Sequence, residues 1–289
     1  MNNRIIFSDD EDLIDYSTAL NNYKAGTKSF SYVTGEDFFY IGARLPFNHF
    51  YAKFQRASEL TDSEMTLEYW NGTEWCDIVE LIDETNGFSE NGYVTWVTSK
   101  DKEWSCEDTN YNGNQVEGLE DVVIYDRYWI RISFDQSFDG GDDGVIPTPA
   151  RVPCIISWLG NIFSNDNDLA GEHKALTKQS LMTAFEAGKT SWEEQHEIAA
   201  RELISDLVEN GNILEKGQIL SREDYRLASV SKTAEIIYGQ LGDDYKDEVV
   251  TARKVYKERL SKRRPIIDTN LNGREDNGEG FQEQRFFKR

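Results

Sequence analysis

The chain has 289 residues, with 53 acidic and 31 basic side chains, a formal net charge of −22 and a pI near 4.5. Hydrophobic residues make up 38% and aromatic residues 12% of it, which is too much apolar surface for a disordered polypeptide. No stretch approaches about 18 apolar residues and the N-terminus is acidic, so we expect neither a membrane-spanning helix nor a secretory signal. The three cysteines lack Cys-x-x-Cys spacing, which argues against a zinc site.

The acidic excess lies in the first half of the chain. Residues 1–150 carry 10 basic and 29 acidic side chains, a net charge of −19, whereas residues 151–289 carry a net charge of −3. A surface this acidic repels phosphate backbones, so we expect protein partners rather than duplex DNA for that half. Aromatic residues, Thr and Asn dominate the first half, and Ala, Glu, Lys and Leu dominate the second. The sequence therefore predicts two domains of different fold.

The first half is typical of β-structure. Asn-Gly pairs, which favour tight hairpin turns, separate several short runs rich in β-branched and aromatic residues. These runs are 38–41, 50–54, 65–70, 93–97 and 128–132. We predict an α+β chain of two domains, of which the first is an antiparallel, jelly-roll-like β-sandwich over residues 31–150. An N-terminal arm over residues 1–30 is expected to precede it.

Three tryptophans of this half have two interpretations. Trp70 and Trp75 flank the Asn-Gly turn of the sharpest hairpin, and Trp96 lies in a later strand. Core and cross-strand packing explains such rings in most proteins. An exposed indole face can also stack on a pyranose ring, so the three residues are candidates for a glycan platform.

A segment rich in Gly, Asp and Pro, residues 135–153, predicts a linker. The apolar run 152–159 overlaps its end. This run either returns to the sheet as a last strand or packs at the junction of the domains.

The second half has the apolar period of helices. Amphipathic stretches begin near Ser191, Ser221 and Asp243. The first starts with a capping-box pattern in which Ser191 precedes Glu194 by three residues. We predict a helical bundle over residues 151–264, with a further helix within 171–188 and an extended tail over residues 265–289.

Catalytic motifs are absent from the sequence. It contains no Gly-x-Ser-x-Gly, no phosphate-binding Gly-Lys-Ser/Thr loop and no His-Glu-x-x-His. His196 lies among Glu193, Glu194 and Glu197 near the start of a helix, where we expect it on a solvated face. We therefore predict a non-enzymatic protein without catalytic residues.

The tail matches the calcium-loop pattern D-x-[DN]-x-[DN]-G-x5-E. Oxygen ligands at alternate positions can surround one Ca²⁺, and Gly273 permits the sharp turn. The expected ligands are Asp268, Asn270, Asn272, Arg274 through its carbonyl, Asp276 and Glu279. The alternative is a solvated polar tail, because Pro265 interrupts the entering helix and Glu275 replaces an apolar pairing residue. No cofactor is expected to be required.

Basic and aromatic residues surround this loop. A solvated basic face is the ordinary explanation of such runs, and the functional alternative is docking on an acidic partner with phenylalanine anchors. The acidic first half of the chain is one such surface. The candidate docking residues are Arg263, Arg264, Phe281, Arg285, Phe286 and Phe287.

Three pieces of the first half occur in a recognisable order: residues 69–75, 87–96 and 128–132. Together they resemble a discoidin-like jelly-roll module found in structural proteins of tailed bacteriophages. The resemblance implies a fold and a virion context more than a ligand.

The second half carries another resemblance. Residues 191–204, 228–238, 256–260 and 268–279 are similar in order to head-to-tail adaptor (connector) proteins of tailed bacteriophages. That family implies a ring, commonly of twelve copies, beneath the portal, with the helical bundle around the DNA channel. The tail 265–289 would insert against the portal. The sandwich in front departs from short adaptors, so its task stays open.

The resemblance implies a structural protein of the virion neck, between capsid and tail, made in the host cytoplasm. Its expected partners are the portal protein, a tail-proximal neck or tail-terminator protein and further copies of itself. DNA would pass through the channel without sequence-specific binding, and no membrane is involved. The alternatives are a carbohydrate-binding tail or baseplate component and a calcium-dependent interaction protein.

Overall fold

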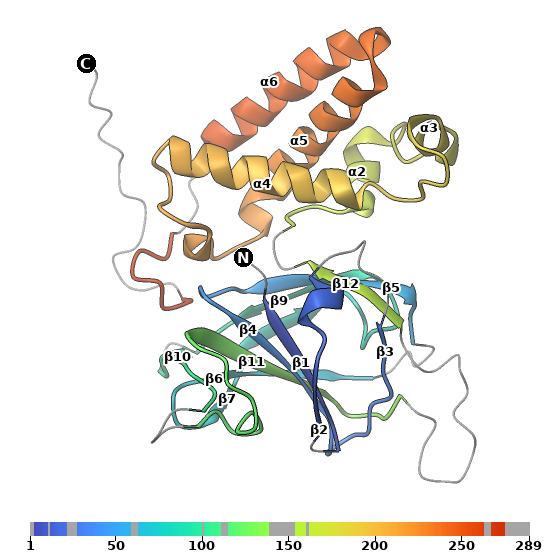
Figure 1. Cartoon of the computed structure of the whole chain (residues 1–289). Coiled ribbons are helices and arrows are strands. Elements are labelled where there is room, and N and C mark those ends of the chain that lie inside the picture. Colours follow the sequence, from blue (N-terminus) through green and yellow to red (C-terminus); the bar gives the residue numbers. More distant parts are fainter. Residues whose placement is uncertain are drawn as a thin grey trace. The chain divides into compact units, whose positions relative to one another are not determined.

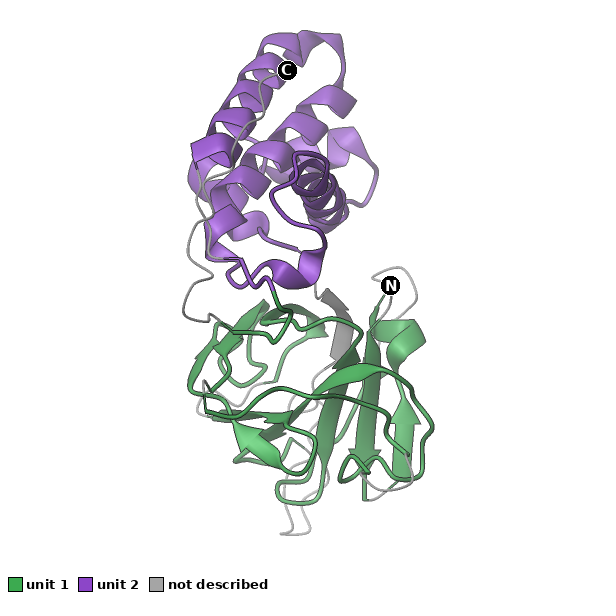
Figure 2. Cartoon of the chain, turned by 90° about the vertical axis from the view of Figure 1, so that its left-hand side faces the viewer, with its two compact units in different colours: residues 1–160, 270–276 green, residues 161–269, 277–289 purple. Residues whose placement is uncertain are grey.

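The computed structural model describes residues 3–10, 12–21, 28–58, 63–99, 101–110, 115–138, 154–159 (backbone alone), 162–262 and 267–274. These residues form two compact units (Figure 2). The first comprises the described residues up to 159 together with 270–274, and the second comprises 162–262 with 267–269. Antiparallel strands dominate the first unit and helices make up the second, so the predicted α+β class is confirmed (Figure 1).

The first unit is a sandwich of two antiparallel sheets (Figure 1). The seven-stranded sheet has the order β2 (Asp12–Asp15), β1 (Arg4–Asp9), β4 (Phe38–Ala43), β11 (Arg127–Phe134), β6 (Met65–Trp70) and β7 (Trp75–Asp77), with β10 (Cys106–Glu107) also paired to β11. The five-stranded sheet has the order β3 (Lys28–Ser29), β12 (Cys154–Leu159), β5 (His49–Arg56), β9 (Gly92–Val97) and β8 (Glu80–Asp83). A short helix, α1 (Ser17–Leu20), follows β2.

The main core lies between the two sheets and is largely aromatic. Strand alternation directs Phe39 and Ile130 of one sheet and Phe50 of the other into it. Phe88, which is fully buried, has its ring centroid 4.8 Å from that of Phe134. Tilted contacts of this kind add to the burial of apolar area, so the aromatic runs that predict the strands also hold the sheets together.

A second, smaller core covers the outer face of the seven-stranded sheet. Its buried members are Ile6, Tyr40, Trp70, Trp75, Val116, Leu119, Ile124 and Trp129. The segment 115–124 supplies three of these side chains, and the indole Nε1 of Trp75 donates to the carbonyl of Glu117 at 3.1 Å. Strand β4 is therefore buried on both faces, and Trp70 of β6 and Trp129 of β11 add buried side chains on the outer face, which explains why these sequences alternate only partly.

Two boundaries of the predicted sandwich are wrong. The predicted arm over residues 1–30 contains β1, whose Ile5, Ile6 and Phe7 are buried on both faces of the sheet. Within the apolar run 152–159, residues 154–159 return to the sheet as β12 beside β5, so the helical unit begins after residue 160 rather than at 151. Strand β1 has apolar neighbours on either face and so lacks the alternation that marks a half-exposed strand.

The second unit is a set of packed helices. Its elements are α2 (Asp166–His173), α3 (Gln179–Phe185), α4 (Glu193–Glu209), α5 (Glu223–Leu241) and α6 (Lys246–Lys262), with single 3₁₀ turns at Lys216–Gln218 and Asp243–Tyr245. Leu203 of α4, Ala228 of α5 and Tyr256 of α6 share one buried cluster. Trp192 and Val230 belong to a second. The predicted amphipathic stretches thus become α4, α5 and α6.

The helix starts differ from the predicted ones. Helix α4 begins after Trp192, whose amide donates to Asp166 Oδ1 at 3.1 Å, whereas the predicted cap Ser191 accepts from the amide of Glu193 at 3.4 Å. A capping box instead opens α2: the amides of Asp168 and Asn165 donate to each other's side chains at 2.9 and 3.1 Å. Among the described residues, no helix has a long enough apolar stretch to cross a bilayer.

Tyr32 clamps two distant segments of the sandwich. Its hydroxyl accepts from the amide of Phe134 at 2.8 Å and donates to the same residue's carbonyl at 3.3 Å. Burial raises the pKa of Tyr32 from 10.0 to about 12. The neutral phenol therefore stabilises the fold fully below pH 10, and this contribution is lost as the pH rises to about 12.

We expect Tyr32→Phe to flatten the alkaline loss of stability over that pH range. Urea unfolding followed by tryptophan fluorescence measures it, with Tyr125→Phe as the control because Tyr125 is exposed. Equal pH profiles for the wild type and Tyr32→Phe would contradict the assignment.

Candidate functional site

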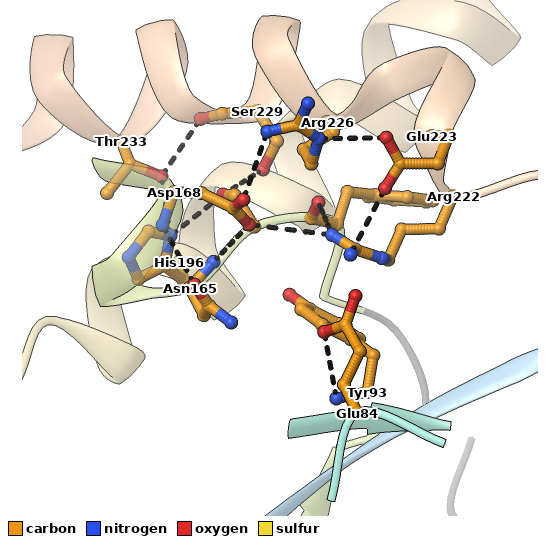
Figure 3. Close-up of polar contacts among 12 residues, drawn as sticks. Glu84, Tyr93, Asn165, Asp168, His196, Arg222, Glu223, Arg226, Ser229 and Thr233 are labelled. Atoms are coloured by element: carbon orange, nitrogen blue, oxygen red, sulfur yellow. Dashed lines mark hydrogen bonds and ion pairs between the residues drawn. The ribbon is translucent and has the colours of Figure 1, made fainter. Parts of the chain in front are cut away.

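A buried polar cluster lies where the segment before α2 meets α4 and α5 (Figure 3). His196 of α4 is at its centre: Nδ1 lies 2.8 Å from Ser164 Oγ and 3.2 Å from Thr233 Oγ1. On the opposite side of the ring, Nε2 lies 3.3 Å from Asp166 Oδ1. Ser164 Oγ is also 2.7 Å from Ser229 Oγ. Three hydroxyls thus gather at one edge of the imidazole and one carboxylate lies at the other.

The contacts of this cluster select a tautomer of the imidazole. Thr233 Oγ1 donates to the carbonyl of Ser229 at 2.9 Å, so its proton is not directed at the ring. The Asp166 carboxylate does not meet hydrogen-bond geometry with Nε2, but its negative charge 3.3 Å away favours a proton on that nitrogen, which leaves Nδ1 to accept from the Ser164 hydroxyl. His196 and the hydroxyl residues have no solvent-exposed surface or almost none. A connected network of this kind fixes the relative positions of the elements that it joins.

Charged groups extend the cluster to the start of α5 (Figure 3). The Arg222 side chain is buried; its Nη1 donates to the carbonyl of Phe163 at 3.3 Å and lies 3.5 Å from Asp168 Oδ2. Arg226 Nη1 lies 3.1 Å from the other oxygen of the same carboxylate. Arg222 also pairs with Glu223 at 3.1 Å. One carboxylate in the first turn of α2 therefore ties that helix to two arginines at the start of α5.

The cluster contains the residue types of a Ser-His-Asp triad, and its burial decides what they can do. A nucleophilic serine has to approach a substrate atom while its base takes the proton. Ser164 has no exposed surface, and its hydroxyl already contacts two side chains. In this conformation the cluster positions helices and is closed to a substrate.

The predicted solvated position of His196 is wrong. The ring is fully buried, because His196 shares one face of α4 with Ala199, Ala200, Leu203 and Leu207. Steps of three, four and seven residues identify this face in the sequence. The neighbouring Glu193, Glu194 and Glu197 led to the prediction of a solvated face, although the apolar spacing indicated a buried one.

The candidate glycan platform does not form on the surface. Trp70, Trp75 and Trp96 are 2%, 9% and 4% exposed. The first two rings meet edge to face, with centroids 5.2 Å apart, in the core under the segment 115–124. Trp96 lies in the main core, 5.3 Å from Phe47 between centroids. Core and cross-strand packing is the correct interpretation of all three.

Residues 270–274 belong to the sandwich unit and form what we call the C-terminal strap. The carbonyl of Leu271 accepts from the Tyr128 hydroxyl at 3.3 Å, and the carbonyl of Gly273 accepts from Thr98 Oγ1 at 3.2 Å. Gly273 has φ +80°, and a Cβ there would lie 2.9 Å from the Trp104 ring. Glycine is required both by the conformation and by the close approach to the indole.

The strap contains part of the predicted calcium loop. The side chains of Asn270 and Asn272 accept from backbone amides at 3.2 and 3.1 Å. Of the other four predicted ligands, Asp268 and Arg274 are described, whereas Asp276 and Glu279 lie outside the described residues. The docking candidates Arg263, Arg264, Phe281, Arg285, Phe286 and Phe287 lie outside them as well. In the described part of the chain no group of three His, Cys, Asp or Glu could hold a metal ion. The calcium loop and the docking residues stay predictions.

Comparison with known proteins adds no relative. No protein-family model matches the chain, and no curated protein is significantly similar to it. Its function has to be inferred from its own residues.

Proposed function

We propose that this chain is a structural protein of a tailed-phage neck, an oligomeric head-to-tail adaptor that joins the portal to the tail around the DNA channel. The main support is the order of elements in the second half. Helices α4, α5 and α6, of 17, 19 and 17 residues, coincide with the pieces that resemble adaptors, and the calcium-loop-like segment follows them.

The charge of the chain suits this function. A conduit has to let DNA slide, and acidic surfaces do not adhere to phosphates. The chain has a net charge of −22, of which the helical half expected around the channel carries −3, so neither half offers the duplex an excess of positive charge. Its partners would be the portal, a tail-proximal neck or tail-terminator protein and neighbouring copies, in a virion assembled in the host cytoplasm.

A ring also explains how weak docking residues could suffice. Each copy contributes one tail, and simultaneous engagement of many tails multiplies a modest affinity. The candidate contacts at each tail are the basic pair Arg263 and Arg264 and the terminal phenylalanines. Carbohydrate binding through Trp70, Trp75 and Trp96 is not supported, because these rings are buried.

Electron microscopy of the purified protein, alone and mixed with the portal ring from the same source, tests the proposal. We expect rings that cap the portal. The double variant Arg263→Glu/Arg264→Glu should lose this binding, whereas Lys254→Glu/Lys257→Glu, the same charge change on exposed residues of α6, should keep it. Wild-type protein that leaves the portal bare would overturn the adaptor function.

A further inference from the structure

Strand β8 is an open edge of the sandwich. It is the last strand of the five-stranded sheet, and its one neighbour within the described residues is β9. The amide of Glu84 donates to the carbonyl of Tyr93 at 2.8 Å. Along an antiparallel strand, residues bonded to the neighbouring strand alternate with residues whose backbone groups face the other way. Leu81 and Asp83 therefore direct their backbone N–H and C=O groups away from β9, to the open edge.

Exposed aliphatic side chains lie beside this edge. Val79, Ile82 and Val97 are 62%, 61% and 45% exposed, and we call them the β8 patch. The amide of Val79 donates to the carbonyl of Val97 at 3.0 Å, and β8 pairs antiparallel with β9, so the three residues belong to one corner of the sheet. Asp77 and Glu80 are exposed next to them. The patch is thus apolar with an acidic border.

The described chain ends close to this patch. The strap is hydrogen-bonded to Thr98, which directly follows Val97 at the end of β9. Residues 275–280 lead from the strap to Phe281, and six residues can span up to about 20 Å. A segment attached at this point has a high effective concentration at the β8 patch.

The end of the chain has the complementary chemistry. Residues 285–289 contain three basic residues, two phenylalanines and no acid, and Phe281 lies shortly before them. Phenylalanine and arginine are the residue types that anchor interfaces, and basic residues are attracted by an acidic border. An extended peptide that adds to a sheet edge gains main-chain hydrogen bonds as well.

We propose that residues 281–289 of the chain dock on its own β8 edge as an added strand. Phe286 covers Ile82 and the rest of the β8 patch, Phe287 takes the opposite face of the added strand, and the terminal bases face Asp77 and Glu80. The docking shields the open edge and keeps the phenylalanines out of water. It concerns the free chain, in which the phenylalanines proposed to contact the portal are not yet engaged there, and it does not depend on the adaptor function.

Residue-resolved hydrogen exchange of the full chain tests this docking. An amide at an open edge exchanges fast, and a strand added there protects it. We expect the amides of Leu81 and Asp83 to exchange about tenfold slower or more in the wild type than in the variant Phe286→Ser/Phe287→Ser. Tyr125→Ser, which removes an aromatic ring exposed elsewhere on the sandwich, should leave both rates unchanged.

Dilution separates the chain's own segment from that of another copy. Protection by the same molecule does not change with protein concentration, whereas protection by a second copy falls on dilution and would overturn the proposal. Fast exchange of both amides in the wild type would overturn it as well. The variants alter none of the buried residues that form the described cores, so a failure to fold does not confuse the result. Loss of portal binding, measured separately, bears on the adaptor function alone.

Discussion

Gly42→Ala is expected to destabilise the sandwich by about 2–3 kcal/mol, although it adds one methyl group. Gly42 lies in β4 directly opposite Trp129 of β11, and a Cβ at this position would lie 2.6–2.8 Å from three atoms of the indole ring. The indole cannot move away easily, because it is fully buried in the outer core and its Nε1 donates to the carbonyl of Glu107 at 3.3 Å. The cross-strand pair therefore depends on the absence of a side chain.

The same substitution at Gly239 supplies the control. Gly239 lies within α5 and a Cβ there would meet nothing within 4 Å, so Gly239→Ala should stabilise the helical unit by about 0.5–1 kcal/mol. Tryptophan fluorescence mainly follows the sandwich, because Trp192 is the one tryptophan of the helical unit, and far-ultraviolet circular dichroism follows the helices. A Gly42→Ala variant as stable as the wild type in urea would contradict the packing described for Trp129.

His196→Ala is expected to cost the helical unit about 3 kcal/mol. The substitution leaves a cavity among α2, α4 and α5 and removes one of the two partners of the Ser164 hydroxyl. It also leaves Asp166 facing an empty space on its inner side, although that carboxylate still accepts from the amide of Trp192. Urea unfolding followed by circular dichroism measures the loss.

His173→Ala is the matched control for this histidine. His173 is the last residue of α2 and is only partly buried, with its ring centroid 6.1 Å from that of Tyr238. Its replacement should cost about 1 kcal/mol or less. If the two variants lose the same stability, the cluster around His196 does not hold the helices together.

The parts of the fold that the sequence predicts are those with a local signature. Aromatic and β-branched runs predict β4, β5, β6, β9 and β11, because such residues fit a pleated, buried surface. The Asn71-Gly72 turn predicts the hairpin of β6 and β7, and Gly72 has the expected positive φ, +98°. Amphipathic period and glycine stops predict α4 and α5.

The missed parts depend on contacts distant in sequence. The segment 115–124 contributes Val116, Leu119 and Ile124 to the outer core without the period of a strand or a helix, so no local pattern indicates that it covers a sheet. The polar cluster is similar: Ser164 and Ser229 are 65 residues apart and common in type, and their meeting is set by helix packing. Only His196 carried a usable signal, its place on the apolar face of α4.

The C-terminal strap makes the helical unit an insertion within the sandwich unit, since residues 270–274 return to the sheets after α6. A truncated chain that ends at residue 160 would keep the strands β1 to β12 that the described residues form but lose the strap. The hydroxyls of Tyr128 and Thr98 would lose their carbonyl partners, and the Trp104 ring would lose the glycine packed against it. Likewise, after a single proteolytic cut between residues 160 and 270, the N-terminal fragment would contain the sheets. The C-terminal fragment would stay bound to them through the strap.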